Sequence, residues 1–213
     1  MALAFSKDDI AFIKNLMIEA GELCAAIQKR GVTVQKKKDS TIITEADIQV
    51  QEMLVRGIER RFPDMKFIHE EKQEENYRDV REDTWLAVID PLDGTAVYSM
   101  GLPTWSISVG FFFGFEPKYG FVFSPPSNLF YHNDDIAAYR NGVRIVVDPD
   151  MQIDSESNLF VTAEIFRLYH VSFPGKVRNL GSTALHGCLV ADNTMTRTVA
   201  YIGRSYLWDW GGV

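Results

Sequence analysis

Hydrophobic residues in the first third of the chain recur every three to four positions, which is the spacing of an amphipathic helix. Ser6 and Asp9 have the pattern of a capping box at the start of a first helix, and Gly31 ends the periodic pattern. A second capping box, Thr44 with Asp47, starts a second helix. The apolar faces comprise Ile13, Met17, Ala20, Cys24 and Ile27 in the first helix, and Val50, Leu54, Ile58 and Phe62 in the second.

From residue 66 onward the pattern changes to short runs rich in β-branched and aromatic residues, separated by glycine, proline and asparagine. We expect a mostly antiparallel sheet with strands at residues 66–69, 85–89, 105–113, 119–123, 129–131 and 144–147. A charge-rich stretch, residues 70–84, separates the first two strands and is predicted to be an exposed, mobile loop.

The last third of the chain has fewer elements. The pattern predicts strands at 159–163 and 198–202, with a helix between them that is opened by Gly181-Ser182-Thr183. Asp209 has the setting of a first helical turn, but Val213 follows too soon for a helix to form. We therefore expect the chain to be a fragment of a longer one, or its last element to be supplied from elsewhere.

Composition narrows the class of protein. The 213 residues are 46% hydrophobic, which is typical of a folded chain, and carry a formal net charge of -7. That charge argues against nucleic acid or an anionic membrane as the partner and favours a small molecule or a cation. The N-terminus lacks a signal-peptide pattern, and the longest apolar block, residues 107–115, is too short to span a bilayer, so we expect a cytoplasmic protein. Cys24 and Cys188 are predicted to be buried hydrophobes in a reducing compartment.

The most informative stretch is "AVIDPLDGTAVY", residues 87–98. Pro91 excludes the helical region for Asp90 and fixes a turn, so that Asp90 is expected to finish a strand while Asp93 begins a turn beside it. Two carboxylates so close together either raise one pKa or recruit a cation. With the Leu92 carbonyl as a further hard ligand, the oxygen-only donor set favours Mg²⁺, Mn²⁺ or Ca²⁺ over Zn²⁺.

Gly94 and Thr95 follow this motif. If a short helix starts there, its free backbone N–H groups form an anion site next to the metals, and phosphate is the natural anion. Metal ions about 4 Å apart that bridge a phosphate oxygen and a water would activate the water for in-line displacement. The stretch therefore predicts phosphate-ester hydrolysis.

Two other interpretations of the motif are weaker. An Asp-Pro turn can merely cap a strand, and Asp148-Pro149-Asp150 is an example in this chain, but that segment lacks the preceding apolar strand and the Gly-Thr pair. Residues 92–95 also resemble the signature of haloacid dehalogenase phosphatases. In that signature the nucleophilic aspartate stands two positions before the second one, where this chain has Pro91, so the covalent route lacks its nucleophile.

Four motifs in order, "ITEAD" (43–47), "FIHEE" (67–71), "DPLDGT" (90–95) and "WD" (208–209), together resemble the inositol monophosphatase family of magnesium-dependent, lithium-sensitive phosphatases. The resemblance extends from the first helix to Asp209. It implies an α/β (α+β) fold, a layered αβαβα sandwich, as one domain over residues 1–213. Residues 1–147 would form the metal-binding half, and residues 148–213 a second half that is shorter than in the family.

The resemblance also implies the metal ligands. Glu70, Asp90 and the Leu92 carbonyl would bind one metal, and Asp90, Asp93 and Asp209 would bind the second. Glu70 would also contact a weaker third metal. The expected cofactor is Mg²⁺, two or three ions, with Mn²⁺ as a substitute.

By the same resemblance, Asp47 and the Thr95 hydroxyl would orient the attacking water, with Glu70 beside them. Asp93, Gly94 and Thr95 would hold the phosphate, and Gly181-Ser182-Thr183 would lie against the substrate. Asp47 also has an ordinary explanation as the third position of its capping box.

The chain departs from the family pattern at two positions. His69 stands where the family commonly has glycine, which removes no ligand. Ile202 stands where inositol-hydrolysing members place a glutamate that holds a substrate hydroxyl, so inositol specificity is in doubt. The expected activity is hydrolysis of a small phosphate monoester, such as an inositol, sugar or polyol phosphate, fructose bisphosphate or a 3'-phosphoadenosine phosphate, by a homodimer. The alternative is a non-catalytic metal- or phosphate-binding regulator with the same fold.

Overall fold

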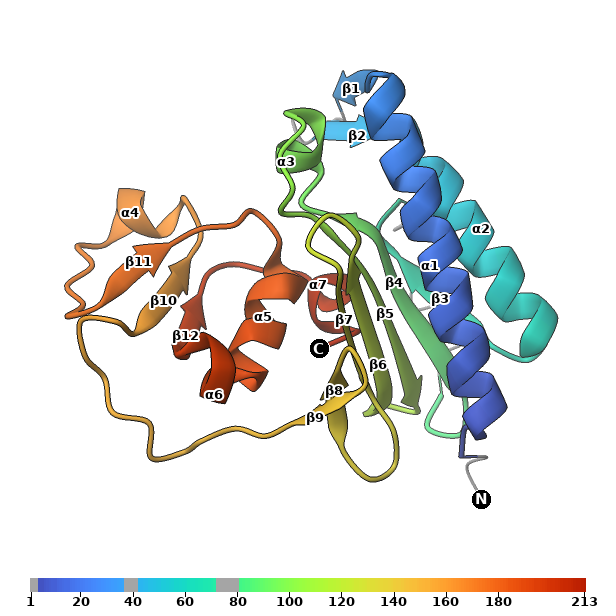
Figure 1. The fold of residues 1–213 in the computed structure, drawn as a ribbon. Helices are drawn as coiled ribbons and strands as arrows, with labels where there is room; N and C mark the ends of the chain where they lie inside the picture. The colour runs from blue at the N-terminus through green and yellow to red at the C-terminus, as the bar shows by residue number, and fades with distance from the viewer. Residues whose placement is uncertain (1–3, 37–41, 72–80) are drawn as a thin grey trace.

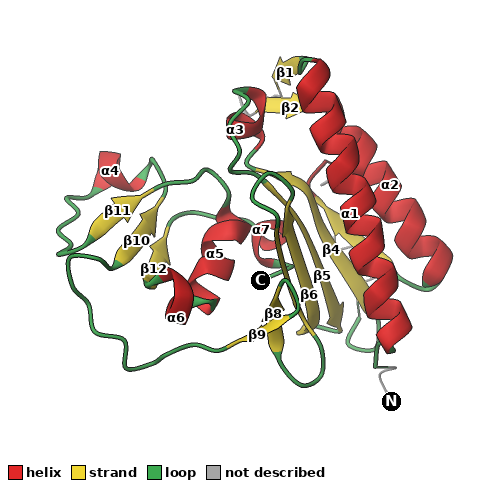
Figure 2. Ribbon diagram, viewed as in Figure 1, coloured by secondary structure: helices red, strands yellow, loops and turns green. Residues whose placement is uncertain are grey.

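Two long helices pack side by side on one face of a large sheet (Figures 1 and 2). The computed structural model describes residues 4–36, 42–71 and 81–213. Helix α1 spans Lys7–Arg30 and α2 spans Glu45–Arg61, and each begins at its expected capping box, with Ser6 and Thr44 as the N-caps. Both predicted helices are therefore confirmed. Their apolar stripes and the facing side of the sheet form the main hydrophobic core.

In the described part of the chain, seven strands form this sheet, in the order β3-β4-β5-β6-β7-β8-β9. Strand β3 pairs parallel to β4, and the other neighbours pair antiparallel, which confirms the mostly antiparallel sheet. The strands are β3 (Lys66–His69), β4 (Trp85–Asp93), β5 (Ser106–Phe113), β6 (Glu116–Ser124), β7 (Leu129–Asn133), β8 (Ala138–Arg140) and β9 (Val143–Ile145).

The last hairpin of the sheet differs from the sequence prediction. Strand β8 was not predicted, and β9 ends at Ile145, two residues before the predicted end. Asn141 and Gly142 connect the two strands, both with positive φ (49° and 79°). Asn-Gly is a strong signal for a tight hairpin, and it could have located this one.

Strand β4 continues through the Asp-Pro motif, so the prediction that the strand ends at Asp90 is wrong. Its pairing with β5 runs from Trp85 to Asp90, shifts register, and resumes at Asp93 opposite Ser106. Two residues of β4 thus face one of β5, which is a β-bulge. Pro91 has no N–H to give to the ladder, and a bulge accommodates it without a lost hydrogen bond.

On its other face, the large sheet is covered by α5 (Thr183–Ala191) and the one-turn helix α7 (Leu207–Trp210). Figure 1 shows a second sheet beyond them, in the order β11-β10-β12, with parallel pairing. Its strands and neighbouring helices are β10 (Asn158–Val161), α4 (Ile165–Leu168), β11 (Lys176–Arg178), α6 (Asn193–Thr196) and β12 (Thr198–Ile202). The succession of helix, sheet, helix and sheet layers confirms the layered sandwich, as well as the predicted strands near 159 and 198 and the helix opened by residues 181–183.

Other short elements were only partly foreseen. Strands β1 (Val34–Lys36) and β2 (Ile42–Thr44) form a small hairpin that was not predicted. Helix α3 (Thr95–Ser99) begins after Gly94, where a short helix was considered. Helix α7 does form, contrary to the expectation that the chain is too short there, because a single turn needs only the four residues 207–210. The predicted loop at 70–84 includes residues 72–80, which lie outside the described residues.

The segment after α7 lies against the sheet with no side chain between the two backbones. A Cβ on Gly110 of β5 would come within 1.6 Å of the Gly211 carbonyl oxygen. A Cβ on Gly120 of β6 would come within 2.5 Å of the Gly212 carbonyl oxygen. Glycine at these two strand positions is therefore required for the close approach, which brings α7 down onto β4 and β5.

Both cysteines are free and buried, Cys24 in α1 and Cys188 in α5, as expected. Among the described residues, no helix combines the length and the apolar character needed to cross a bilayer.

Candidate active site

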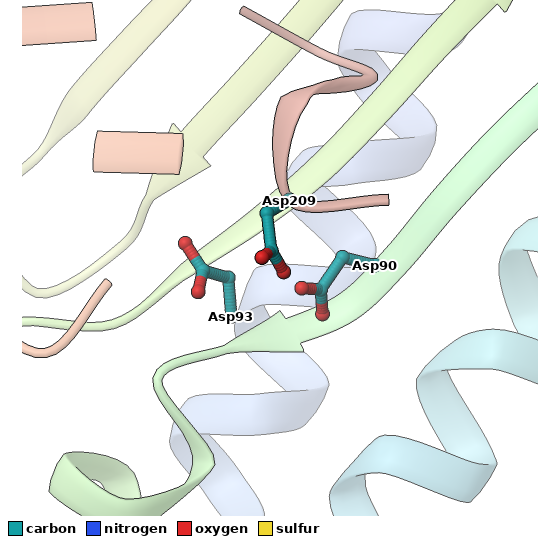
Figure 3. A group of neighbouring side chains, drawn as sticks. All are labelled: Asp90, Asp93 and Asp209. Carbon is teal, nitrogen blue, oxygen red and sulfur yellow. The ribbon is translucent and has the colours of Figure 1, made fainter. Parts of the chain in front are cut away.

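Three aspartates from distant parts of the chain converge at the end of β4. Asp90 and Asp93 flank the bulge, and Asp209 comes from α7. Figure 3 shows the three side chains gathered at this point. One carboxylate oxygen from each lies within 4.8 Å of the others. The structure thus brings together three of the predicted metal ligands.

The electrostatics of this cluster are unfavourable without a cation. Burial, followed by the charges of Glu70, Asp93 and Asp209, raises the pKa of Asp90 well above its ordinary value. Burial and the charge of Asp209 raise the pKa of Asp93 to about 7, although hydrogen bonds to its carboxylate oppose this shift. Burial likewise raises the pKa of Asp209 to about 6, against an opposing hydrogen bond from the Tyr206 amide. Carboxylates that resist ionisation together are suited to a divalent cation, which prefers oxygen ligands and would balance their charge.

Glu70 lies beside this cluster. It follows directly after β3, whose last residue, His69, pairs with Ile89 of β4, so Glu70 comes next to Asp90 at the same edge of the sheet. The charge of Glu70 raises the pKa of Asp90, Asp209 and Asp47, which indicates that it lies near all three. In the next residue, the Glu71 amide donates to the Gln51 side chain at 3.2 Å, which ties this segment to α2.

Asp93 is bound to the N-terminus of α5. The Ser182 hydroxyl donates to Asp93 Oδ2 at 2.6 Å, and the Ala184 amide donates to the same oxygen at 2.7 Å. Ser182 is the N-cap of α5 and also accepts from the Leu185 amide at 3.2 Å. A carboxylate at a helix N-terminus is favoured by the free N–H groups and by the helix dipole. The predicted metal ligand and the predicted substrate segment are therefore in direct contact.

The two carboxylate oxygens of Asp47 accept hydrogen bonds from two different residues. Oδ2 accepts from the Thr44 amide (2.7 Å) and hydroxyl (2.5 Å), which is the capping box of α2. Oδ1 accepts from the Thr95 hydroxyl at 3.0 Å. Burial, together with the charge of Glu70, raises the pKa of Asp47, while the hydrogen bonds from Thr44 and Thr95 oppose the shift. The capping explanation and contact with the predicted catalytic threonine both hold.

The other predicted residues lie around this pair. The Leu92 carbonyl lies 3.1 Å from the Thr95 hydroxyl, and the Leu92 amide donates to Asp90 Oδ1 at 3.0 Å, which is an Asx turn across the proline. Gly94 has φ 95° and precedes α3, and a Cβ there would approach the Gly181 carbonyl oxygen at 3.1 Å. The Thr183 hydroxyl lies 3.3 Å from that of Tyr201. The loops before α3 and α5 thus meet.

Sequence reasoning missed two residues next to the site, Ser106 and Ser108 of β5. They are fully buried and pair with Asp93 and Asp90, respectively, across the bulge. Ser106 Oγ lies 2.9 Å from Ser182 Oγ, and Ser108 Oγ accepts from the Gly212 amide at 3.1 Å. The signal was available, because two serines two positions apart in an apolar strand place polar groups on one face.

Comparison with known sequences decides the family. The sequence profile described as "Inositol monophosphatase family" matches residues 7–212, nearly the whole chain. The chain belongs to the inositol monophosphatase family. Its members are phosphatases that act on phosphoric monoesters and depend on metal ions, typically Mg²⁺, so this member of the inositol monophosphatase family is a phosphoric monoester hydrolase.

Relatives and solved structures agree with this assignment. The chain is 32% identical over 215 residues to the fructose-1,6-bisphosphatase/inositol-1-monophosphatase of Thermotoga maritima, covering 95% of this chain and 78% of that protein. A solved IMPase of Thermotoga maritima matches with a TM-score of 0.78 and 26% identity, covering 96% of this chain and 80% of that one. A solved IMPase/NADP phosphatase complexed with NADP and Ca²⁺ shares the fold, with a TM-score of 0.82, 19% identity and coverage of 99% and 80%.

Proposed function

We propose that this protein hydrolyses a small phosphate monoester with a metal-activated water, without a phosphorylated enzyme intermediate. The observation that carries this proposal is the convergence of Asp90, Asp93 and Asp209, with oxygens within 4.8 Å of one another, beside the hydrogen-bonded pair Asp47 and Thr95. The three aspartates are suited to bind cations, and the pair Asp47 and Thr95 is suited to orient a water. Together they supply what a phosphate ester needs for hydrolysis.

The donor set fits Mg²⁺. Carboxylate and carbonyl oxygens are its preferred protein ligands, and the raised pKa values of the three aspartates mark a negative charge that is not balanced locally. We assign Glu70, Asp90 and the Leu92 carbonyl to one ion, and Asp90, Asp93 and Asp209 to a second, with Glu70 also near a third; Mn²⁺ would substitute. When bound, these ions would lower the pKa of a coordinated water and neutralise charge on the phosphate.

Asp47 and Thr95 would orient the water. The Thr95 hydroxyl has one proton, and when it donates that proton to Asp47 Oδ1 at 3.0 Å, its oxygen lone pairs can accept from a water O–H. Asp47 Oδ2 is held by Thr44, so the carboxylate cannot turn away from the threonine. The raised pKa of Asp47 makes it a better proton acceptor than an exposed aspartate.

Backbone N–H groups would hold the phosphate. Gly94, in the left-handed conformation, allows the turn from β4 into α3 and gives the ester close access to the amides of Gly94 and Thr95. The segment Gly181-Ser182-Thr183 contacts Gly94 and would form the opposite wall. Asp93 links the two, since its carboxylate is bonded to the start of α5.

The side chain at position 202 bears on the substrate class. Ile202, at the end of β12 and 47% exposed, cannot hydrogen-bond a sugar hydroxyl. This favours a substrate other than inositol monophosphate, and the names of the similar proteins suggest fructose 1,6-bisphosphate and NADP as substrates to test. A 3'-phosphoadenosine phosphate belongs in the same panel.

The decisive experiment is phosphate release from this panel in the presence of Mg²⁺, with Asp93→Asn as the loss-of-function variant. We expect at least one ester to be hydrolysed by the wild type and none by Asp93→Asn. Asp148→Asn is the matched control, because Asp148 belongs to the other Asp-Pro segment and should keep full activity. If the wild type bound Mg²⁺ yet released no phosphate from any ester, the regulator interpretation would replace the enzyme.

Lithium inhibition and a homodimeric state are also part of the proposal, on the strength of the family assignment. Inhibition of turnover by LiCl, relieved by excess Mg²⁺, would support competition at a metal site. Light scattering of the purified protein gives the oligomeric state directly.

A further inference from the structure

Ser106 is fully buried on β5, directly opposite Asp93 of β4. Its hydroxyl lies 2.9 Å from that of Ser182, which is also fully buried. The Ser182 hydroxyl in turn bonds to Asp93 Oδ2 at 2.6 Å. Two serines from different layers of the fold therefore form a chain of hydroxyl groups that ends on a predicted metal ligand.

The direction of the protons in this chain follows from counting donors. Asp93 Oδ2 is an acceptor, so the one proton of the Ser182 hydroxyl is donated to it. Ser182 Oγ then has two lone pairs, and the Leu185 amide takes one of them at 3.2 Å. The Ser106 hydroxyl donates to the other. Both hydroxyl groups are thus polarised toward the Asp93 carboxylate.

This arrangement commits one oxygen of Asp93. Oδ2 accepts both from Ser182 at 2.6 Å and from the Ala184 amide at 2.7 Å, and these two bonds occupy its lone pairs. The Thr183 amide also bonds to this carboxylate, so the start of α5 supplies three donors to Asp93, and Oδ1 is the oxygen that receives neither of the two bonds to Oδ2. A carboxylate held in this way has a fixed rotamer and binds through a single oxygen.

We propose that Ser106 is a positioning residue: through Ser182 it fixes the Asp93 carboxylate so that only Oδ1 is presented to the metal centre. The proposal rests on the proposed metal-dependent phosphatase function. It adds that metal occupancy is coupled to the start of α5, because the hydrogen bonds that orient Asp93 also hold residues 182–184, the predicted substrate wall. Loss of Ser106 weakens both the binding of the metal and the hold on residues 182–184.

The test is Mn²⁺ binding to Ser106→Ala, followed by electron paramagnetic resonance of the free ion and independent of turnover. Removal of a group that orients a metal ligand typically costs about 10- to 100-fold in metal affinity, so we expect the Kd of the tightest Mn²⁺ site to rise by about 10-fold. Ser124→Ala is the matched control. Ser124 is fully buried on the neighbouring strand β6, and its hydroxyl makes no hydrogen bond within the described residues. The Kd of the tightest Mn²⁺ site in Ser124→Ala should equal that of the wild type.

A double-mutant cycle separates positioning from simple loss of packing. Because Ser106 acts through Ser182, Ser106→Ala should have little further effect on the Kd in a Ser182→Ala background. Thermal melting of each variant in EDTA reports stability alone, and we expect Ser106→Ala and Ser124→Ala to melt within a few degrees of each other, about 1 kcal/mol or less apart.

Three results would overturn the proposal: an unchanged Kd in Ser106→Ala, additive effects in the cycle, or a Mn²⁺-soaked crystal with Asp93 bound through both oxygens. Failure of the proposed function has a different signature, since the wild type itself would then bind no Mn²⁺ or hydrolyse no ester. Substrate KM in Mg²⁺ gives a further readout, and it should rise in Ser106→Ala if the metal ligand and the substrate wall are coupled.

Discussion

Each of the four aspartates around the site has one carboxylate oxygen bonded to a backbone amide. The donors are the amides of Thr44 for Asp47, Leu92 for Asp90, Ala184 for Asp93 and Tyr206 for Asp209. Three of these amides lie at the start of a helix and the fourth lies in an Asx turn. A buried carboxylate would otherwise lack partners, so these bonds make the burial tolerable and set the direction of the second oxygen.

The raised pKa values predict how stability depends on pH when no metal is bound. Asp93, with a pKa of about 7, and Asp209, at about 6, hold protons in the folded state that the unfolded chain releases near its ordinary value of 3.8. Their contribution to stability is therefore complete below about pH 4 and is lost as the pH rises through about 7. Urea unfolding in EDTA should give a higher midpoint at pH 5.5 than at pH 8 for the wild type.

The variant Asp93→Asn isolates this effect. It removes a titrating group whose pKa is raised to about 7, so the difference between the two pH values should shrink. An equal difference in the variant and in the wild type would assign the pH dependence to other groups.

Thr95 gives a second prediction at this scale. Thr95→Ala removes the hydroxyl that joins Asp47 to the proposed water, and we expect kcat to fall by about 100-fold or more, in the range of lost acid–base contributions. Mg²⁺ affinity should change little. Ser99→Ala is the control, because Ser99 ends the same short helix, is only locally bonded and lies on the exposed side. Equal kcat values for the two variants would contradict the role of Thr95.

Among the elements, β5 organises the site although it supplies no predicted ligand. Ser106 bonds to the N-cap of α5, Ser108 bonds to the segment after α7, and Gly110 lets that segment approach the sheet. These three alternate positions point to the same face of the strand. One face of β5 thus sets the places of both Asp93 and Asp209.

Gly110→Ala tests this role. A methyl group there would overlap the Gly211 carbonyl, at 1.6 Å, and the obstacle is backbone that cannot rotate away. We expect a loss of unfolding free energy of about 3 kcal/mol or more, or displacement of α7 with loss of Mg²⁺ binding. Gly142→Asn in the exposed β8–β9 turn, where a Cβ meets nothing within 4 Å, should be nearly neutral, because asparagine tolerates positive φ. Calorimetry of both variants with and without Mg²⁺ measures the loss of stability and the loss of stabilisation by Mg²⁺.

Some elements could be predicted from the sequence, and others could not. Helices α1 and α2 were predictable because capping box, periodicity and stop signal agree within one segment. The continuation of β4 past Pro91 was not, because the proline indicates a turn locally and only pairing with β5 keeps the strand going. Similarly, the clustering of Asp90 and Asp93 was expected from their spacing, whereas the bond from Asp93 to α5 depends on tertiary packing.

For the whole molecule, the site lies where layers meet. Asp47 comes from the helix layer on one face of the large sheet, Asp90 and Asp93 come from the sheet, and Asp209 comes from the helix layer on the other face (Figure 1). Cations bound by Asp90, Asp93 and Asp209 would therefore join the large sheet to α7, next to the Asp47 side chain of α2. Metal binding should stabilise the fold as a whole and not only a loop.

Mg²⁺ should accordingly raise the Tm. At a free concentration of about 100 times Kd, binding adds about 2.7 kcal/mol, or roughly 5–10 °C for a chain of this size. Differential scanning calorimetry with Mg²⁺ and with EDTA measures the shift, and Asp93→Asn should lose most of it. A Tm that does not depend on Mg²⁺ in the wild type would contradict a cation site between the layers.

The anchoring of the four aspartates to backbone amides also bears on how quickly the site fills. Since the ligands are oriented during folding, little of the chain has to rearrange when a cation arrives. The rate of cation binding is then set by how fast the ion loses part of its water shell. Mg²⁺ gives up water reluctantly, so Mn²⁺ and Ca²⁺ should enter faster than Mg²⁺ even where they bind no more tightly.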